Sequence, residues 1–129
     1  MKTINPSELS PMQVQMILQT AVAPRPIALA STIDKNGNVN LSPFSFFNLF
    51  SSNPPILIFS PARRVRDNST KDTLHNVLEV PEVVIGNVNF DMVQQVSLSS
   101  TEYETGVDEF IKSGLTKKPS ELVKPPLIA

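Results

Sequence analysis

A short polar segment beside a predicted helix start is the first candidate for chemistry. Residues 69–73 read STKDT, and the apolar residues that follow at intervals of three and four predict a helix over 71–79, capped by Ser69 or Thr70. The first turn of a helix presents unpaired N–H groups and a partial positive charge. With the hydroxyls and the Lys71 ammonium added, this segment can hold a phosphate. The alternative is an ordinary helix cap with solvated side chains, which is the commoner case.

Hydroxyl and aromatic side chains upstream are weaker candidates. Ser31 and Thr32 lie inside a predicted apolar strand, where hydroxyls often satisfy only each other or the backbone. The same alternative applies to Ser45. The aromatic pair Phe46 and Phe47 can wall a flat ligand, although such pairs more often belong to a core.

The charged residues give no catalytic pattern. His75 is the only histidine, so it makes neither a triad nor a metal site by itself, and we interpret it as a helix-surface residue. An arginine cluster can meet a phosphate or belong to a solvated loop; its members are Arg63, Arg64 and Arg66. The acidic residues expected on the solvated surface are Glu102, Glu104, Asp108 and Glu109. The glycine patterns of dinucleotide folds and of phosphate-binding P-loops do not occur.

Composition limits the protein class further. The 129 residues suffice for one domain, and a net charge of −1 gives no electrostatic case for nucleic acid or an acidic membrane. The absence of cysteine excludes disulfides, thiolate metal sites and thiol catalysis, and it fits a reducing cytoplasm. No apolar run approaches the roughly 20 residues that span a bilayer, and the N-terminus does not read as a signal peptide. We therefore expect a cytoplasmic protein without a membrane anchor.

The elements that must position these candidates are short and separated by turn residues. Helices are expected over 11–20, 71–79, 90–97 and 107–113, with Ser10 capping the first and Gly114 ending the last. Strands are expected over 27–33, 39–44, 46–50, 56–59 and 83–88, and another begins within 124–129. The segment 34–37, DKNG, predicts a tight turn between the first two strands. The fully apolar strand 56–59 is expected to be buried, and the helix over 71–79 is expected to bury Leu74, Val77 and Leu78.

The order of the motifs is more informative than any one of them. PRPIAL, ST-D-NG, N-L-P-S-FN, NPP and KDT follow one another between Ser10 and Asn89, and GLT…PS…VKPPLIA comes after them. This succession resembles the flavin reductase-like family of FMN-binding split β-barrels, which includes flavoredoxins and ferric or flavin reductases. The resemblance implies a β-rich α+β split barrel, with FMN held against the sheet at a homodimer interface.

The same resemblance implies roles for particular residues. Ser31 and Thr32 would lie along the flavin and its chain, and Ser60 would close a strand end near the ligand. The residues expected to approach the isoalloxazine are Ser45, Phe46, Phe47 and Asn48. The residues expected near the FMN phosphate are Lys71, Asp72 and Thr73, which agrees with the anion site inferred from the helix start.

The resemblance also implies an incomplete domain and a redox function. Members of the family carry further barrel strands after the position of Ala129, so residues 1–129 are expected to form a single domain shortened at its C-terminal end. An NAD(P)H-dependent flavin reductase-like oxidoreductase is the leading expectation, with a small molecule or a protein as electron donor or acceptor. The alternatives are an FMN electron-transfer protein that does not use the nicotinamide directly, and a non-catalytic scaffold of the same fold.

Overall fold

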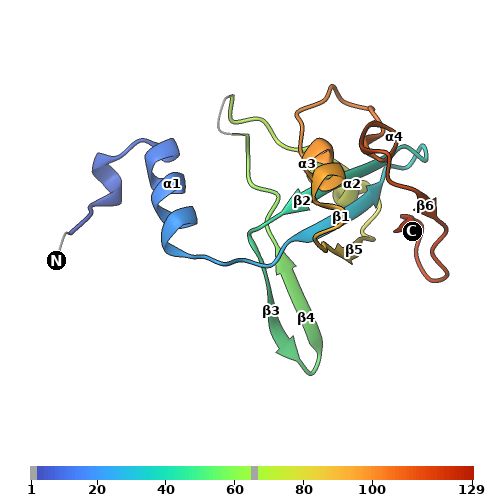
Figure 1. Ribbon diagram of the computed structural model, residues 1–129, viewed down its shortest axis with the longest axis horizontal. Coiled ribbons are helices and arrows are strands. Elements are labelled where there is room, and N and C mark those ends of the chain that lie inside the picture. Colours follow the sequence, from blue (N-terminus) through green and yellow to red (C-terminus); the bar gives the residue numbers. More distant parts are fainter. Residues whose placement is uncertain (1–2, 65–66) are drawn as a thin grey trace.

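A three-stranded antiparallel sheet forms the centre of the computed structural model, which describes residues 3–64 and 67–129. Its strand order is β2-β1-β5, with bounds β1 (Ala28–Ile33), β2 (Val39–Phe44) and β5 (Val84–Asn87) (Figure 1). The turn between β1 and β2 forms as predicted: Asp34 Oδ1 accepts hydrogen bonds from the N–H groups of Asn36 and Asn38, and Gly37 takes a φ of 90°. The first two predicted strands are therefore confirmed.

Helices cover both faces of this sheet. Alternate residues of a strand point to opposite faces, so Leu29 and Thr32 of β1 meet different helices. Leu29 packs with Val96 of α3 (Val93–Ser99) and Phe110 of α4 (Glu109–Ser113) in the main apolar cluster. Thr32 meets α2 (Asp72–Glu79) on the other face. The central sheet is thus fixed on both sides, which makes it a rigid support for the loops at its ends.

The buried face of α2 is polar, contrary to the predicted apolar face. α2 buries Thr73 and Asn76, while Leu78 is 76% exposed. The reason is that the strands beneath α2 present Thr32 and Asn40, whose side chains pair with Asn76 and Thr73 respectively. The predicted cap is also wrong, because the N-cap residue is Lys71 and no side chain caps the helix.

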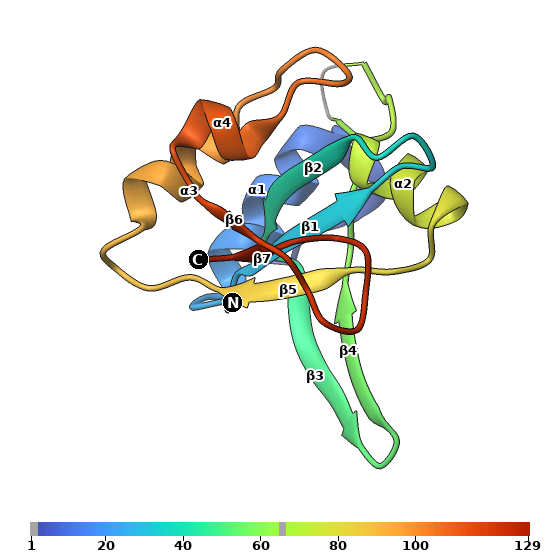
Figure 2. The same ribbon diagram turned by 90° about the vertical axis from the view of Figure 1, so that its right-hand side faces the viewer.

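A second hairpin projects away from the central sheet (Figure 2). It consists of β3 (Phe47–Ser52) and β4 (Pro55–Phe59), which pair only with each other among the described strands. The prediction that 56–59 is a buried strand is wrong, because Leu57 is 51% exposed and its neighbours are similarly open. Phe59 at the end of the strand packs on Phe44, whereas Ile56, Leu57 and Ile58 leave an apolar surface that another molecule can cover.

The N-terminal segment stands apart from the sheet (Figure 1). After the short 3-10 helix η1 (Pro6–Glu8), α1 (Pro11–Ala21) begins at the predicted Ser10 cap, where Ser10 and Gln13 form a capping box. None of the residues of α1 is buried. Its C-terminal end is held by Arg25, whose Nη1 donates to Gln19 O at 2.6 Å and also to Val22 O.

The C-terminal segment returns to the central sheet. β6 (Lys117–Lys118) pairs with β7 (Leu127–Ile128), which confirms the strand expected near the end and adds a partner that the sequence did not indicate. Ile128 packs against the apolar cluster around Leu29. Gly114 ends α4 in the left-handed conformation, with φ 71°, as predicted. No helix in the described ranges has the length and apolar character needed to cross a bilayer.

Candidate functional site

A pocket of about 320 Å³ opens where α1, the end of β2 and the loop before α2 meet. Three cationic residues line it, namely Arg63, Arg64 and Lys71. Hydroxyl and aromatic groups line it too, from Phe44, Ser45, Phe46 and Ser60. We call it the anion pocket, because its charged lining is cationic except for Glu102.

Lys71 is held in this pocket by an aromatic ring. Its Nζ lies 5.1 Å from the ring centroid of Phe44, within the range of a cation–π contact. Burial lowers the pKa of Lys71, the nearby Arg64 lowers it further, and Glu102 opposes this effect. A ligand anion would relieve the repulsion between Lys71 and Arg64, so the pocket is electrostatically suited to one.

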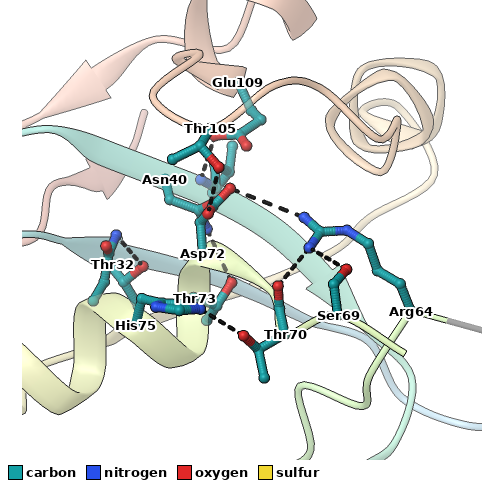
Figure 3. Close-up of polar contacts among 12 residues, drawn as sticks. Thr32, Asn40, Arg64, Ser69, Thr70, Asp72, Thr73, His75, Thr105 and Glu109 are labelled. Carbon is teal, nitrogen blue, oxygen red and sulfur yellow. Dashed lines mark hydrogen bonds and ion pairs between the residues drawn. The ribbon is translucent and has the colours of Figure 1, made fainter. Parts of the chain in front are cut away.

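Arg64 ties the loop before α2 to the helix (Figure 3). Its Nη1 donates to Ser69 Oγ at 3.3 Å and to the carbonyl oxygen of Thr70, and its Nη2 lies 4.0 Å from Asp72 Oδ2. The Thr70 hydroxyl shares a hydrogen bond with His75 Nε2. The hydroxyls of Ser69 and Thr70 are therefore engaged in hydrogen bonds with Arg64 and His75, and neither residue lines the anion pocket. The groups available to an anion in that pocket are the cationic side chains.

A second pocket adjoins the first and differs from it in chemistry. Its volume is about 440 Å³, and it shares Ser45 and Phe46 with the anion pocket. It is mostly apolar, and its other lining residues include Leu18, Val22, Phe47, Asn48, Phe50 and Ile58. We call it the apolar pocket. A ligand with an anionic end and a flat apolar end would match the two chambers together.

The predicted site residues divide into two groups in the structure. Those that line the two adjoining pockets are Ser45, Phe46, Phe47, Asn48, Ser60 and Lys71. Those that do not are Ser31, Thr32, Asp72 and Thr73. Their roles toward a ligand stay predictions.

The members of the second group have positions inside the fold. Ser31 and Thr32 are fully buried, and Thr32 Oγ1 accepts a hydrogen bond from Asn76 Nδ2 at 3.2 Å. Asp72 faces Arg64 and accepts a hydrogen bond from Thr105 Oγ1 at 3.2 Å. Ser31 and Thr32 have no exposed surface, backbone included, and neither residue lines the anion pocket or the apolar pocket.

Of the arginine cluster, Arg63 and Arg64 line the anion pocket, and Arg66 lies outside the described residues. His75 is exposed on α2, as interpreted from the sequence. The described residues contain no group of three or more histidine, cysteine, aspartate or glutamate side chains that is able to hold a metal ion.

The sequence interpretation missed a buried carboxylate. Glu109 was expected on the solvated surface, but it is only 8% exposed. Its Oε2 accepts a hydrogen bond from Leu41 N at 2.9 Å, at the free edge of β2. Burial is the main cause of a raised pKa at Glu109. A β-strand edge with unpaired N–H groups is the signal that would have indicated such an acceptor, but the sequence does not show which strand forms an edge.

Glu109 also connects to α2. In the amide orientation that satisfies its neighbours, Asn40 Nδ2 donates to Glu109 Oε1 at 3.2 Å and Asn40 Oδ1 accepts from Thr73 Oγ1 at 3.0 Å. We call Glu109, Asn40 and Thr73 the Glu109 network; it links α4, β2 and the first turn of α2 (Figure 3).

Known proteins resemble this chain over most of its length. An uncharacterized protein of Aquifex aeolicus (strain VF5) is 43% identical over 107 residues, which are 83% of this chain and 54% of that protein. The crystal structure of nitrilotriacetate monooxygenase component B from Bacillus cereus is similar with a TM-score of 0.92 and 28% identity, over 99% of this chain and 62% of that one. The structure of the 2-nitrobenzoate 2-nitroreductase of Pseudomonas fluorescens has a TM-score of 0.84 and 27% identity, over 99% of this chain and 60% of that one.

This chain therefore spans between half and two thirds of the length of the proteins it matches. The antiparallel sheets and their helices agree with the split-barrel fold of the similar structures, which confirms the predicted fold class. The sequence profile of the flavin reductase like domain matches residues 20–129. Because this match covers the central sheet and most of the lining of both pockets, the chain belongs to the flavin reductase like domain family.

Proposed function

We propose that this chain forms the FMN-binding part of an NAD(P)H-dependent, flavin reductase-like oxidoreductase. The observation that supports this most is the pair of adjoining pockets, one cationic and one apolar, which share Ser45 and Phe46. FMN has the matching chemistry, with a phosphate at one end and a flat ring system at the other. The redox proteins among the similar structures, a monooxygenase component and a nitroreductase, agree with this assignment.

The residues that would hold FMN follow from the two linings. Lys71 and Arg64 would face the phosphate, since both are cationic and line the anion pocket. Phe46 and Phe47 would contact the ring system through the apolar pocket. Ser45 lines both pockets, so its hydroxyl or backbone would contact the middle of the ligand.

A bound flavin supplies hydride acceptance from a nicotinamide and onward electron transfer, which is chemistry that no side chain provides. The work of the chain is then to bind and orient the ligand and to limit its contact with water. This chemistry needs no acid or base from the chain. Cationic side chains at the phosphate contribute affinity, and the aromatic walls exclude water from one side of the ring system.

We also propose that the protein is a homodimer that associates through the β3–β4 hairpin. The exposed apolar residues there are Leu49, Phe50, Ile56, Leu57 and Ile58. A hairpin with this much apolar surface favours burial against another molecule. Phe50 and Ile58 also line the apolar pocket, so a partner placed there would help to close it. A cytoplasmic location stays a prediction from the sequence.

The test has two stages. The purified protein is first titrated with FMN and with riboflavin, and binding is followed by the quenching of flavin fluorescence. Tighter binding of FMN than of riboflavin supports the phosphate site, and no binding of either contradicts the proposal. The FMN-loaded protein is then mixed rapidly with NADH or NADPH without oxygen.

Fast loss of the flavin absorbance supports direct use of the nicotinamide. A bound flavin that only a protein donor reduces favours the electron-transfer alternative, and failure to bind flavin favours a non-catalytic scaffold.

A further inference from the structure

The Glu109 network lies directly behind the anion pocket. We propose that Glu109 is a positioning residue for this pocket, which acts through Asn40 and Thr73 to fix the first turn of α2 and, with it, Lys71. The inference rests on the proposed function, because it concerns the site assigned there to a ligand phosphate. It adds a role for a side chain that lies outside the lining of the anion pocket.

The network has a fixed end and a dependent end. The fixed end is Glu109, since its Oε2 accepts from Leu41 N at 2.9 Å and Leu41 itself is fully buried in the sheet. The dependent end is Thr73, which is 1% exposed and lies in the first turn of α2. Asn40 connects the two ends with contacts of 3.2 and 3.0 Å. The carboxylate therefore determines which way the Asn40 amide faces, and the amide determines how Thr73 is held.

Lys71 moves with this turn of the helix. The carbonyl oxygen of Lys71 accepts hydrogen bonds from Leu74 N at 3.0 Å and His75 N at 3.4 Å. The Lys71 side chain does not cap the helix. The backbone of Lys71 is therefore held to α2 through its carbonyl oxygen. The first turn of α2, in turn, has Thr73 as its buried residue. A displacement of Thr73 would thus shift the Lys71 ammonium relative to the pocket.

A small polar cavity of about 40 Å³ joins the two sites. Glu109, Asn40, Thr73 and Lys71 all line it, so no apolar layer separates the network from the base of the lysine. Asp72 on α2 and Asp108, the N-cap residue of α4, disfavour ionisation of Glu109. Other charged groups face it too, since Arg64, Lys71 and Glu102 line the same small cavity. Two roles are therefore distinguishable: Glu109 acts by its length and contacts, or by its negative charge.

The experiment separates length from charge with two variants. Glu109→Asp keeps the charge but shortens the side chain, so it cannot reach Leu41 N and Asn40 together. Glu109→Gln keeps the length, and Asn40 can turn its amide over to pair with it. In that orientation Asn40 Nδ2 donates to Thr73 Oγ1 at 3.0 Å, so the contact that holds Thr73 is kept. We measure FMN and riboflavin affinities, and amide hydrogen exchange at Leu74 and His75 in the ligand-free protein.

Positioning predicts that Glu109→Asp weakens FMN about tenfold and riboflavin less than about twofold, with faster exchange at both amides. Glu109→Gln should stay within about twofold of the wild type for both ligands. Glu79→Gln is the matched control, since Glu79 lies at the other end of α2 and pairs with Lys35. It should leave the affinity ratio unchanged.

Asn40→Ala tests the route. It should reproduce the loss seen in Glu109→Asp, and the double variant should lose no more than either single variant, because both changes interrupt one chain of contacts. Additive losses would overturn the proposed route.

Three other results would overturn the inference. Equal weakening of FMN and riboflavin by Glu109→Asp would mean that Glu109 only supports the fold. Loss of FMN preference in Glu109→Gln but not in Glu109→Asp would mean that the charge matters and the position does not. Equal binding of FMN and riboflavin by the wild type would remove the phosphate site itself, and the proposed function would then fail before any variant is compared.

Discussion

Lys71 places its ammonium 5.1 Å from the centre of the Phe44 ring. Phe44 in turn packs against Phe59 of β4, with ring centroids 5.2 Å apart. These two contacts link the start of α2 to the end of β2 and, through Phe44, to the end of β4. This arrangement gives the cation a defined position in a half-buried pocket, which favours recognition of a single anionic group.

The first prediction concerns the charge of Lys71. Lys71→Met retains the apolar stem on Phe44 but removes the ammonium, so FMN should weaken about ten- to hundredfold and riboflavin should change little. Fluorescence titration with both ligands measures this. Lys118→Met, at an exposed position in β6, is the control and should affect neither. Equal weakening of both flavins by Lys71→Met would contradict a role at the phosphate.

The second prediction concerns pH and the buried carboxyl of Glu109. Its pKa is raised in the folded protein, mainly by burial, so the folded state binds this proton more tightly than the unfolded state does. Its contribution to the free energy of unfolding is greatest below the ordinary carboxyl pKa and is lost as the pH rises through the raised pKa. Glu109→Gln removes this loss.

The free energy of unfolding of Glu109→Gln relative to the wild type should therefore increase from acid to neutral pH. Urea unfolding of both proteins between about pH 4 and about pH 8 measures the difference, in which the titrations of other groups largely cancel. A difference that is constant over this range, or that decreases, would show that Glu109 is not disfavoured as a charged group.

The third prediction concerns the surface of the β3–β4 hairpin. Leu57→Lys places a charge on a residue that is 51% exposed, so the fold should tolerate it while a dimer that buries this surface should dissociate. Sedimentation at several protein concentrations measures the association, and circular dichroism checks the fold. Leu122→Lys, at a residue 94% exposed outside the hairpin, should leave association unchanged. A wild type that sediments as a stable monomer would refute the dimer.

The fourth prediction compares two neighbours on α4. Phe110 is 1% exposed and belongs to the apolar cluster, whereas Ile111 is 76% exposed. Phe110→Ala should lower the free energy of unfolding by about 3–5 kcal/mol. Ile111→Ala should change it by less than about 0.5 kcal/mol. Chemical denaturation of both variants tests this, and similar losses in the two would mean that α4 does not pack on the sheet as described.

The sequence predicted most of the elements because their signals are local. Ser10 and Gln13 cap α1 within one turn, the residues around Asp34 close the first hairpin by themselves, and Gly114 ends α4 through its own conformational freedom. Such features depend on a few consecutive residues, so a single sequence is enough to show them.

The burial of side chains was less predictable, because it depends on which elements pack against one another. Leu57 is apolar but exposed, since its hairpin leaves the central sheet. Glu109 is charged but buried, since it accepts a hydrogen bond from Leu41 N, 68 positions away in the sequence. Neither outcome follows from the residues nearby. Both outcomes depend on which strand forms the edge of the sheet and on which elements pack against it, and tertiary folding decides both.

The candidate site shows the same division. The helix start at Lys71 and the aromatic pair Phe46 and Phe47 were recognisable as candidates, and the structure places them around two adjoining pockets. The contribution of α1 was not predictable, because Gln15 and Leu18 reach these pockets only through the path of the chain after Ala21. No local pattern specifies that path.

The position of α1 has a practical consequence. This helix lines both chambers but buries none of its own residues, and Leu18, which lines the apolar pocket, is 53% exposed. A cysteine introduced there would be the sole thiol of the molecule, so a fluorophore could be attached at one defined spot without touching the sheet. Its emission would then report ligand arrival optically, even for compounds that are themselves colourless.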